Sequence, residues 1–284
     1  MVTIEVGADE IRSGKMTQAH LAEAVQAIRE DGFVALRNIV SAASVATLRE
    51  KLIADVAALQ ARPDAPYNWN TGNIQQDPPP FPPYLFRDVL VNEMAVAVTH
   101  AVLGPGVKNA YYSGNTALRS EERQPVHVDV GHLWPDMEEA TPAFGLVVNL
   151  PLVDMSPENG STEIWPGTHR DTTVSLHSPL TVPEAALARW RDRITPIQPV
   201  VSAGSLLIRD IRLWHAGMPN RTDTPRPMIA MIHWTGWYGY AETLRFPKGT
   251  EPIFAHPVLK TVAEFVERPI DYIQAPQAYA FPAR

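Results

Sequence analysis

The chain has 284 residues, of which 45% are hydrophobic and 19% are charged, and its formal net charge is −7. This composition is typical of a globular protein, and the acidic balance argues against a basic surface for nucleic acid. There is no cysteine, which excludes disulfides, thiolate nucleophiles, cysteine-bound zinc and cysteine-bound iron–sulfur clusters. Any metal must therefore be held by nitrogen and oxygen ligands.

The N-terminus lacks the charged and then apolar pattern of a signal peptide. No apolar run approaches the length of about 20 residues that spans a bilayer. We therefore expect a cytoplasmic protein that has no membrane partner and no nucleic-acid partner. Chemistry on a small-molecule substrate is the favoured interpretation, and the sequence does not indicate the oligomeric state.

The opening third of the chain is predicted to be mostly helical. Apolar residues recur at helical spacing over residues 17–30, and Asp31 with the following glycine supplies a stop signal. Residues 32–40 then have the pattern of a strand. A second amphipathic helix follows, with Ser41 and Ser44 as alternative N-caps.

From residue 107 onward the pattern changes to short apolar or alternating runs separated by Gly, Pro, Asn and Asp. Many short strands of this kind predict a sandwich, jelly roll or barrel. Helices followed by strands give an α+β, mainly β protein in which the N-terminal helices back a double-sheet core. We expect one domain over residues 1–284, with 1–106 as helical support and lid, 107–240 as the core, and 241–284 as a C-terminal extension.

The segment QPVHVDVGH, residues 124–132, places two histidines and an aspartate in a predicted strand. Alternate residues of a strand point to the same face, so His127 and Asp129 converge, whereas His132 has the opposite parity. Inside a small barrel, a histidine beside a carboxylate is costly to bury without a metal or a partner. Taken alone, the pair is as compatible with surface polar residues as with a metal site.

A second polar cluster lies in residues 204–234. A strand-like run ends at His215, which would complete a set of two histidines and one carboxylate. Such a set suits non-haem iron(II), because it leaves positions open for a co-substrate and O2. Arg226 follows eleven residues later, and a guanidinium can bind a carboxylate of a dicarboxylate co-substrate through two parallel hydrogen bonds. Arg221 is an alternative anchor.

These motifs resemble those of the phytanoyl-CoA dioxygenase family of iron(II)/2-oxoglutarate-dependent oxygenases. The resemblance runs from the IREDGFVALRN stretch to residue 235. HVD at 127–129 resembles the first two metal ligands of the family. ENGSTEIWPGTHR at 158–170 resembles its Asn-Gly and Pro-Gly segment, and GSLLIRDIRLWHAGMPN at 204–220 resembles its distal-histidine segment. Arg226 falls where the family places its 2-oxoglutarate arginine, so four segments in the same order favour the metal-site interpretation.

The resemblance implies a double-stranded β-helix, which is a jelly-roll or cupin-like core, with the metal near one open end of the barrel. It implies that His127, Asp129 and His215 hold iron(II), that Arg226 anchors 2-oxoglutarate, and that O2 is consumed. The implied reaction hydroxylates an unactivated C–H bond of a small biosynthetic substrate and releases succinate and CO2. The same site can also support desaturation, cyclisation or epimerisation. Related halogenases have a small residue in place of the aspartate, so Asp129 argues against halogenation.

Further site residues are expected on the neighbouring segments. Contacts to 2-oxoglutarate are expected from polar side chains around the metal motif, namely Gln124, Asn115, Thr116 and Thr162. Contacts to the substrate are expected from aromatic and basic side chains near the barrel mouth, namely Tyr112, Arg119, Trp134, Trp165 and Trp69. The aromatic side chains favour a partly apolar substrate, and Arg119 or Arg123 is available for an acidic group.

Two other classes of function remain open. A zinc-dependent enzyme without redox chemistry can use the same three ligands, but it needs a general base and gives no reason for Arg226. A jelly-roll protein that binds a ligand without catalysis is the other class. The remaining histidines are not expected to be ligands: His132 belongs at the pocket mouth or in a loop, His169 in a structural turn, and His233 in the core or pocket wall.

Overall fold

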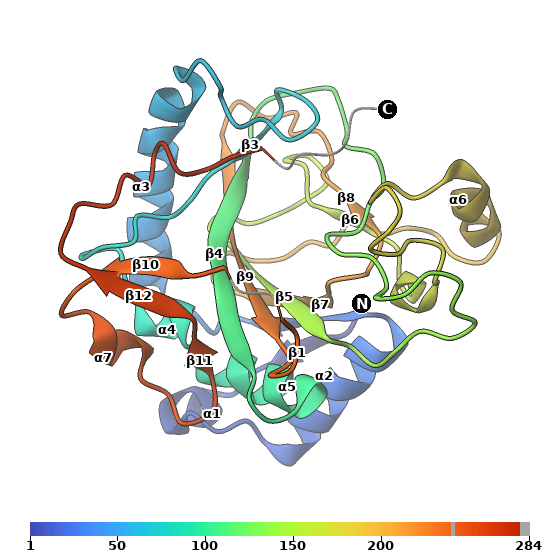
Figure 1. The fold of residues 1–284 in the computed structure, drawn as a ribbon, viewed down its shortest axis with the longest axis horizontal. Coiled ribbons are helices and arrows are strands. Elements are labelled where there is room, and N and C mark those ends of the chain that lie inside the picture. The colour runs from blue at the N-terminus through green and yellow to red at the C-terminus, as the bar shows by residue number, and fades with distance from the viewer. Residues whose placement is uncertain (240–241, 279–284) are drawn as a thin grey trace.

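The computed structural model describes residues 1–239 and 242–278, and Figure 1 shows their arrangement. The predicted boundary at residues 240 and 241 and the last residues of the extension, 279–284, lie outside the described residues. The helices and strands follow in chain order as β1 (Thr3–Glu5), α1 (Ala8–Ser13), α2 (Gln18–Glu30), β2 (Phe33–Arg37), α3 (Ala42–Gln60), β3 (Asn73–Gln75), α4 (Arg87–Leu90), α5 (Glu93–Leu103), β4 (Lys108–Ala117), β5 (Gly145–Pro151), β6 (Glu163–Ile164), the 3-10 helix η1 (Thr168–Arg170), α6 (Glu184–Arg191), β7 (Leu206–Asp210), β8 (His215–Ala216), β9 (Arg226–Trp234), β10 (Leu244–Pro247), α7 (Glu251–Phe254), β11 (Lys260–Thr261) and β12 (Ala263–Val266).

Both predicted N-terminal helices are present. Thr17 caps α2 by accepting a hydrogen bond from the backbone N–H of His20. Ser41 caps α3 in the same way from the N–H of Ser44, so Ser41 and not Ser44 is the N-cap. The strand predicted between the helices is β2, which pairs with β1 and β7. The first third of the chain therefore adds strands to the main sheet as well as helices beside it.

The main sheet has eight strands in the order β1-β2-β7-β5-β9-β4-β11, with β3 paired to β4. Strands β6 and β8 form a small second sheet. Two isolated β-bridges, His127 to His215 and Ile164 to Ile197, extend this sheet. In Figure 1, α2, α3 and α5 lie on one side of the main sheet, and β6, β8 and α6 lie on the other. This mainly β architecture with two facing sheets confirms the predicted fold class.

The predicted strand at residues 124–132 is not a regular strand. It forms isolated bridges at His127 and His132, and its other backbone hydrogen bonds go to separate segments, such as those from Val128 to Leu180 and from Asp129 to Ile211. The ligand segment is therefore an extended loop that lies along the second sheet, and its side-chain directions are not set by a continuous ladder of hydrogen bonds.

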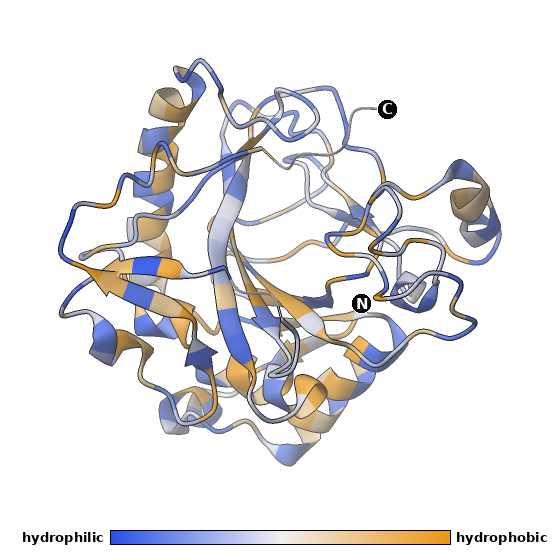
Figure 2. Cartoon of the chain, viewed as in Figure 1, coloured by the Kyte–Doolittle hydropathy of each residue, from blue (hydrophilic) through white to orange (hydrophobic). Residues whose placement is uncertain are grey.

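The side chains of β9 alternate between two interiors. Ile229 and Met231 pack into the large core cluster between the sheet and the helices. Met228 and Ala230 point the other way and line a cavity inside the barrel. Figure 2 shows the apolar residues that run along β5 and β9. Because each buried Ile, Leu or Met contributes about 1.5–3 kcal/mol, this core fixes the register and with it the face of β9 that reaches the cavity.

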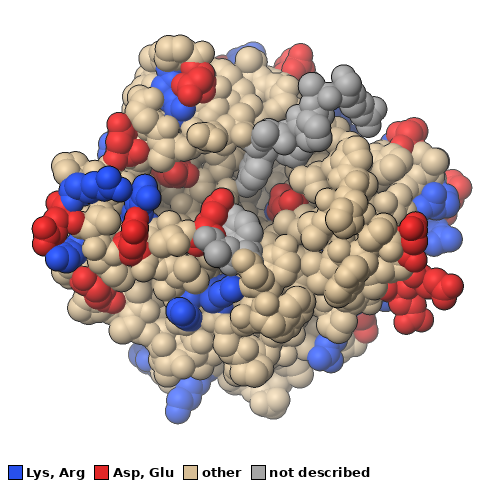
Figure 3. Space-filling view, in the orientation of Figure 1, with Lys and Arg blue, Asp and Glu red and all other residues tan. Residues whose placement is uncertain are grey.

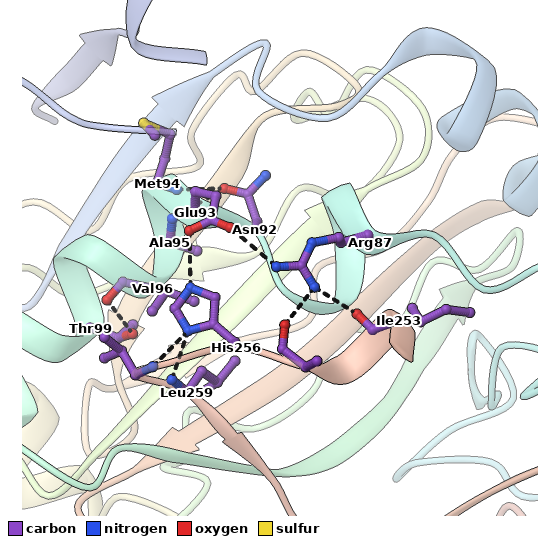
Figure 4. Close-up of polar contacts among 12 residues, drawn as sticks. Arg87, Asn92, Glu93, Met94, Ala95, Val96, Thr99, Ile253, His256 and Leu259 are labelled. Carbon is purple, nitrogen blue, oxygen red and sulfur yellow. Dashed lines mark hydrogen bonds and ion pairs between the residues drawn. The ribbon is translucent and has the colours of Figure 1, made fainter. Parts of the chain in front are cut away.

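A polar cluster fixes the C-terminal extension to the N-terminal helices (Figure 4). Arg87 donates to the carbonyls of Ile253 at 3.0 Å and Ala255 at 2.8 Å, where α7 ends. Glu93, the first residue of α5, accepts from Arg87 at 3.4 Å and lies 2.9 Å from Nε2 of His256. The extension also adds β11 to the edge of β4, so it is packed against the core.

His256 is predicted to stabilise this attachment. Its Nδ1 accepts from the backbone N–H groups of Val258 at 3.0 Å and Leu259 at 2.9 Å, so the ring proton is on Nε2 and donates to Glu93. His256→Ala leaves both N–H groups without this acceptor and should lower the free energy of unfolding by about 1–3 kcal/mol. His256→Asn should retain most of the stability, because an asparagine oxygen accepts from the N–H groups two and three residues ahead. Urea unfolding of both variants checks this, and equal stability of His256→Ala and wild type would contradict it.

Two features bear on contacts with membranes and nucleic acid. No helix in the described part of the chain is long and apolar enough to cross a membrane. On the face drawn in Figure 3, Lys and Arg lie among Asp and Glu and do not form a continuous basic stripe. A stripe of that kind is the usual footprint of a nucleic-acid site.

Candidate metal centre

His127, Asp129 and His215 come together inside the barrel. One ligand atom of each lies within 4.8 Å of those of the other two. The two histidines face each other across the antiparallel bridge that joins their backbones, with ring centroids 4.3 Å apart. Oδ1 of Asp129 lies 3.5 Å from Nε2 of His215. Two segments that are far apart in the sequence therefore supply one compact set of donors.

Backbone carbonyls fix the tautomer of both histidines. Nδ1 of His127 lies 2.8 Å from the carbonyl oxygen of Pro125, and Nδ1 of His215 lies 2.9 Å from that of Leu213. A carbonyl only accepts, so each Nδ1 donates and each Nε2 keeps its lone pair. Two lone pairs and a carboxylate that converge repel one another unless a cation lies between them. The donor set therefore fits iron(II), and the carbonyls orient its imidazoles.

The protonation states of His127 and Asp129 also suit a metal. Burial, together with the neighbouring His215, lowers the pKa of His127 to about 3, so this imidazole is neutral at neutral pH. Burial alone would raise the pKa of Asp129, but the Arg209 guanidinium and His215 hold it well below its usual range. A neutral imidazole and a carboxylate are the forms that bind a metal without first releasing a proton.

Arg226 begins β9 and is 1% exposed. Its Nε donates to the carbonyl of Asn159 at 3.1 Å, and its Nη2 donates to that of Gly160 at 3.1 Å. Both partners are neutral, and no described carboxylate lies within ion-pair distance of this guanidinium. Burial lowers the pKa of Arg226 to about 10. A buried cation without a counter-ion is costly, so the position is suited to an anionic ligand.

The turn at Asn159 and Gly160 places the two carbonyls that hold Arg226. Gly160 has φ of +77°, and a Cβ at this position would lie 2.4 Å from the carbonyl oxygen of Met218. Only glycine fits this conformation and this close approach. The Asn-Gly pair of the sequence motif is therefore explained by the geometry of the arginine site.

One cavity connects the three candidate ligands with Arg226. Alternate residues of β9 line it, from Arg226 through Met228 and Ala230 to Ile232. The remaining described lining includes carboxamide, aromatic and hydroxyl side chains, among them Asn68, Trp69, Asn73, Gln75, Tyr111 and Thr162. The cavity thus brings the buried cation of Arg226 and the metal-ligand set together, and polar and apolar side chains form the rest of its lining.

Three of the four predicted co-substrate contacts line this cavity, namely Gln124, Asn115 and Thr162. Both ends of the Gln124 amide are already bound, since its Oε1 accepts from the N–H of Gly217 at 2.9 Å and its Nε2 donates to the carbonyl of Asn68 at 3.4 Å. Thr116 lies on the opposite face of β4 from Asn115. Its hydroxyl donates to Gln76 at 2.6 Å, away from the cavity.

Among the predicted substrate contacts, Trp69 lines the cavity and its ring centroid lies 4.3 Å from that of His127. Tyr112 does not line it, because its side chain points toward the helices and packs against Phe246. The neighbouring residue Tyr111 faces the cavity instead. Of the predicted aromatic contacts only Trp69 lies on this cavity, and Tyr111, which was not predicted, lies there with it.

The other predicted substrate contacts lie outside the cavity. Arg119 is exposed and forms an ion pair with Asp223. Arg123 pairs with a glutamate on β6 and is also largely exposed. Trp134 is 57% exposed, and Trp165 is buried on the outer side of the second sheet. These four side chains do not form a cation or an aromatic wall next to the metal ligands.

Arg209 on β7 lines the cavity and is the main residue that sequence reasoning missed. Its Nη2 donates to Oδ2 of Asp129 at 2.6 Å. Asn149 on β5 was missed as well. Arg209 shares a face of β7 with Leu207, which also lines the cavity, but β7 is buried on both faces and its hydropathy does not mark that face.

The remaining histidines do not line the cavity. His132 is buried outside it, so the expectation of a place at the pocket mouth is wrong. Nε2 of His169 lies 3.2 Å from the carbonyl of Arg29, as expected for a structural turn. Nδ1 of His233 lies 2.9 Å from the Thr99 hydroxyl on the helix side of β9.

Two of these buried histidines predict acid sensitivity of the metal-free protein. Burial lowers the pKa of His132 to about 4 and that of His233 to about 3, from an ordinary value of 6.5. Below pH 6.5 the unfolded chain binds protons that the native protein does not bind. The free energy of unfolding should therefore fall as the pH drops from 6.5 toward 4, by up to about 1.4 kcal/mol per pH unit for each histidine. Urea unfolding across this range checks the slope, which His233→Asn should reduce. Stability that is independent of pH over this range would contradict the prediction.

Comparison with known proteins gives a family and a fold. The phytanoyl-CoA dioxygenase (PhyH) family model matches residues 28–228. Dioxygenase af480 of Aspergillus fumigatus is 26% identical over 222 residues, which are 77% of this chain and 65% of that protein. The match thus spans slightly less than two thirds of the length of this relative.

Two solved structures have a similar fold. EctD from S. alaskensis, crystallised with 2-oxoglutarate and 5-hydroxyectoine, has a TM-score of 0.57 and 22% identity over 82% of this chain and 83% of that one. SnoK, a non-haem α-ketoglutarate-dependent carbocyclase from nogalamycin biosynthesis, has a TM-score of 0.56 and 16% identity over 77% of this chain and 84% of that one. At these identities the likeness establishes the fold alone.

Proposed function

The chain belongs to the phytanoyl-CoA dioxygenase family, whose members use iron(II), 2-oxoglutarate and O2, and from this premise we propose that it oxidises an unactivated C–H bond of a small molecule. Hydroxylation is the simplest outcome: the substrate gains one oxygen atom of O2, and 2-oxoglutarate gains the other as it becomes succinate and CO2. A small-molecule substrate without a nucleic-acid or membrane partner is part of this proposal.

The observation that carries this proposal is the placement of a metal-binding donor set and a buried guanidinium on one cavity. His127, Asp129 and His215 offer three donors to a cation, and Arg226 offers a positive charge that is held by neutral carbonyls. A dicarboxylate that binds the metal through one end and the guanidinium through the other satisfies both. A zinc hydrolase explains neither Arg226 nor the lining, in which Asp129 is the only carboxylate among the described residues and no carboxylate is left as a base.

In this proposal each residue has a defined task. His127, Asp129 and His215 hold iron(II), which when bound supplies the activation of O2 that drives the oxidation. Arg226 binds the distal carboxylate of 2-oxoglutarate and fixes its direction in the barrel. Trp69 packs against the His127 ring and covers that side of the ligand set from solvent.

The cavity favours a substrate that is uncharged at its reacting end. Arg209 is paired with Asp129, and Arg226 is reserved for the co-substrate. The expected cations for an acidic group, Arg119 and Arg123, lie on the surface in ion pairs. The walls that remain are carboxamides, a phenol, an indole and aliphatic side chains, which suit hydroxyl, carbonyl and ring groups on a partly apolar substrate.

Anaerobic titration of the iron(II)-loaded protein with 2-oxoglutarate tests the proposal. A weak visible charge-transfer band should appear as the co-substrate chelates the metal. Oxygen should then convert 2-oxoglutarate to succinate, and product analysis with candidate substrates distinguishes hydroxylation from desaturation, cyclisation or epimerisation. Bound iron without a band would contradict the proposal and favour the zinc-enzyme or binding-protein interpretation.

A further inference from the structure

Asp129 is held by Arg209, a side chain that neither the ligand set nor the co-substrate site uses. Nη2 of Arg209 donates to Oδ2 of Asp129 at 2.6 Å, and the two side chains are 8% and 22% exposed. A charge-assisted hydrogen bond of this length in a buried site is strong and directional. This hydrogen bond therefore sets the orientation of the Asp129 carboxylate.

The backbone around Asp129 leaves this task to a side chain. The ligand segment is an extended loop. The backbone N–H of Asp129 donates to the carbonyl of Ile211 at the long distance of 3.3 Å. Arg209 is by contrast rigidly placed. It lies within β7, its backbone is in register with both β2 and β5, and its Nε donates to Oδ1 of Asn149 at 3.3 Å. A fixed guanidinium thus sets the orientation of a carboxylate on a less regular segment.

The two oxygens of Asp129 therefore have separate partners. Oδ2 accepts from Arg209, whereas Oδ1 lies 3.5 Å from Nε2 of His215, on the side where the imidazole lone pairs converge. We infer that Arg209 is a positioning residue that holds Asp129 as a ligand through one oxygen. The inference rests on the proposed function and specifies how its metal site stays open.

Single-oxygen binding matters because of the number of coordination positions. If His127, Asp129 and His215 each gave one donor atom to iron(II), positions on the metal would stay open for 2-oxoglutarate and O2. A second oxygen from Asp129 would occupy a position that the co-substrate or O2 needs. By holding Oδ2, Arg209 prevents this competition without touching the metal.

The test compares Arg209→Met, which removes the donor, with Arg209→Lys, which keeps a cation and a donor. Arg212→Met is the matched control, because Arg212 is equally buried and pairs with Asp210 but does not line the cavity. Each protein is checked for native circular dichroism and loaded with cobalt(II), whose visible absorption weakens as its coordination number rises. Anaerobic titration with 2-oxoglutarate then gives the dissociation constant from the same spectrum.

Arg209→Met should show weaker cobalt(II) absorption before co-substrate is added, and its dissociation constant for 2-oxoglutarate should rise about 10- to 100-fold. Arg209→Lys should restore most of both properties, and Arg212→Met should match the wild type. If Arg209→Met does not fold, Arg209→Gln takes its place with the same expected direction. A folded variant with the wild-type spectrum and dissociation constant would overturn the inference. A wild-type protein that gives no spectral response to 2-oxoglutarate would instead overturn the proposed function.

Discussion

Arg226→Met is expected to raise the dissociation constant for 2-oxoglutarate about 100- to 10,000-fold, because two charge-assisted hydrogen bonds, each worth about 1.5–3 kcal/mol, are lost. The guanidinium is buried and donates to the neutral carbonyls of Asn159 and Gly160. The other described cation that lines the cavity, Arg209, is paired with Asp129 and does not replace it. The iron(II)–2-oxoglutarate band, followed during anaerobic titration, gives the dissociation constant directly.

A shortened ligand separates loss of the anchor from damage to the fold. 2-Oxopentanoate keeps the metal-chelating end of 2-oxoglutarate and lacks the distal carboxylate. Wild type and Arg226→Met should therefore bind it with dissociation constants that agree within about threefold. Arg221→Met is the matched control, since Arg221 was the alternative anchor and lies exposed beside Glu121. If Arg221→Met weakens 2-oxoglutarate binding and Arg226→Met does not, the anchor is assigned to the wrong residue.

Elements that depend on local signals could be predicted from the sequence. Helices α2 and α3 follow from the 3.6-residue spacing of their apolar residues and from serine or threonine caps. The three candidate ligands and Arg226 were found because each lies in a short motif. The structure brings them onto one cavity although His127 and His215 are far apart in the chain.

Strand faces were harder to predict, because the strands beside the cavity are buried on both faces. Alternation places Tyr111 on the same face of β4 as Asn115, but most of β4 is buried and its hydropathy does not show which face reaches the cavity. In β7 every residue is buried, because the helices cover one face and the barrel interior covers the other. A strand buried on both faces has no hydropathy alternation, so Arg209 gave no sign of the side on which it lies.

The ligand loop shows a different limit. The sequence predicted that His127 and Asp129 converge because alternate residues of a strand share a face. They do converge, but through a bridge between His127 and His215 and through the contact of Asp129 with Arg209. Tertiary contacts thus produce the arrangement that local periodicity was expected to produce.

His215→Ala is expected to lower the affinity for iron(II) by more than about 100-fold. Loss of a residue that only supports a metal ligand costs about 10- to 100-fold, and loss of the ligand itself should cost more. The change removes one of the converging imidazole lone pairs and leaves His127 and Asp129 to hold the metal alone. Calorimetric titration of the metal-free protein with iron(II) under argon measures the loss. Added imidazole should recover part of the affinity, because the deleted side chain leaves a space of its own shape beside Asp129.

His233→Asn provides the control for this loss, since it removes a buried imidazole from the helix side of β9 without reaching the cavity. It should change stability and leave iron(II) affinity within about threefold of the wild type. The described histidines outside the ligand set, including His132 and His169, do not line the cavity and cannot replace His215 without a change of fold. An iron(II) affinity equal to that of the wild type in His215→Ala would therefore mean that the metal is held elsewhere. The assignment of Arg226 and Arg209 to one oxidative site would then fail as well.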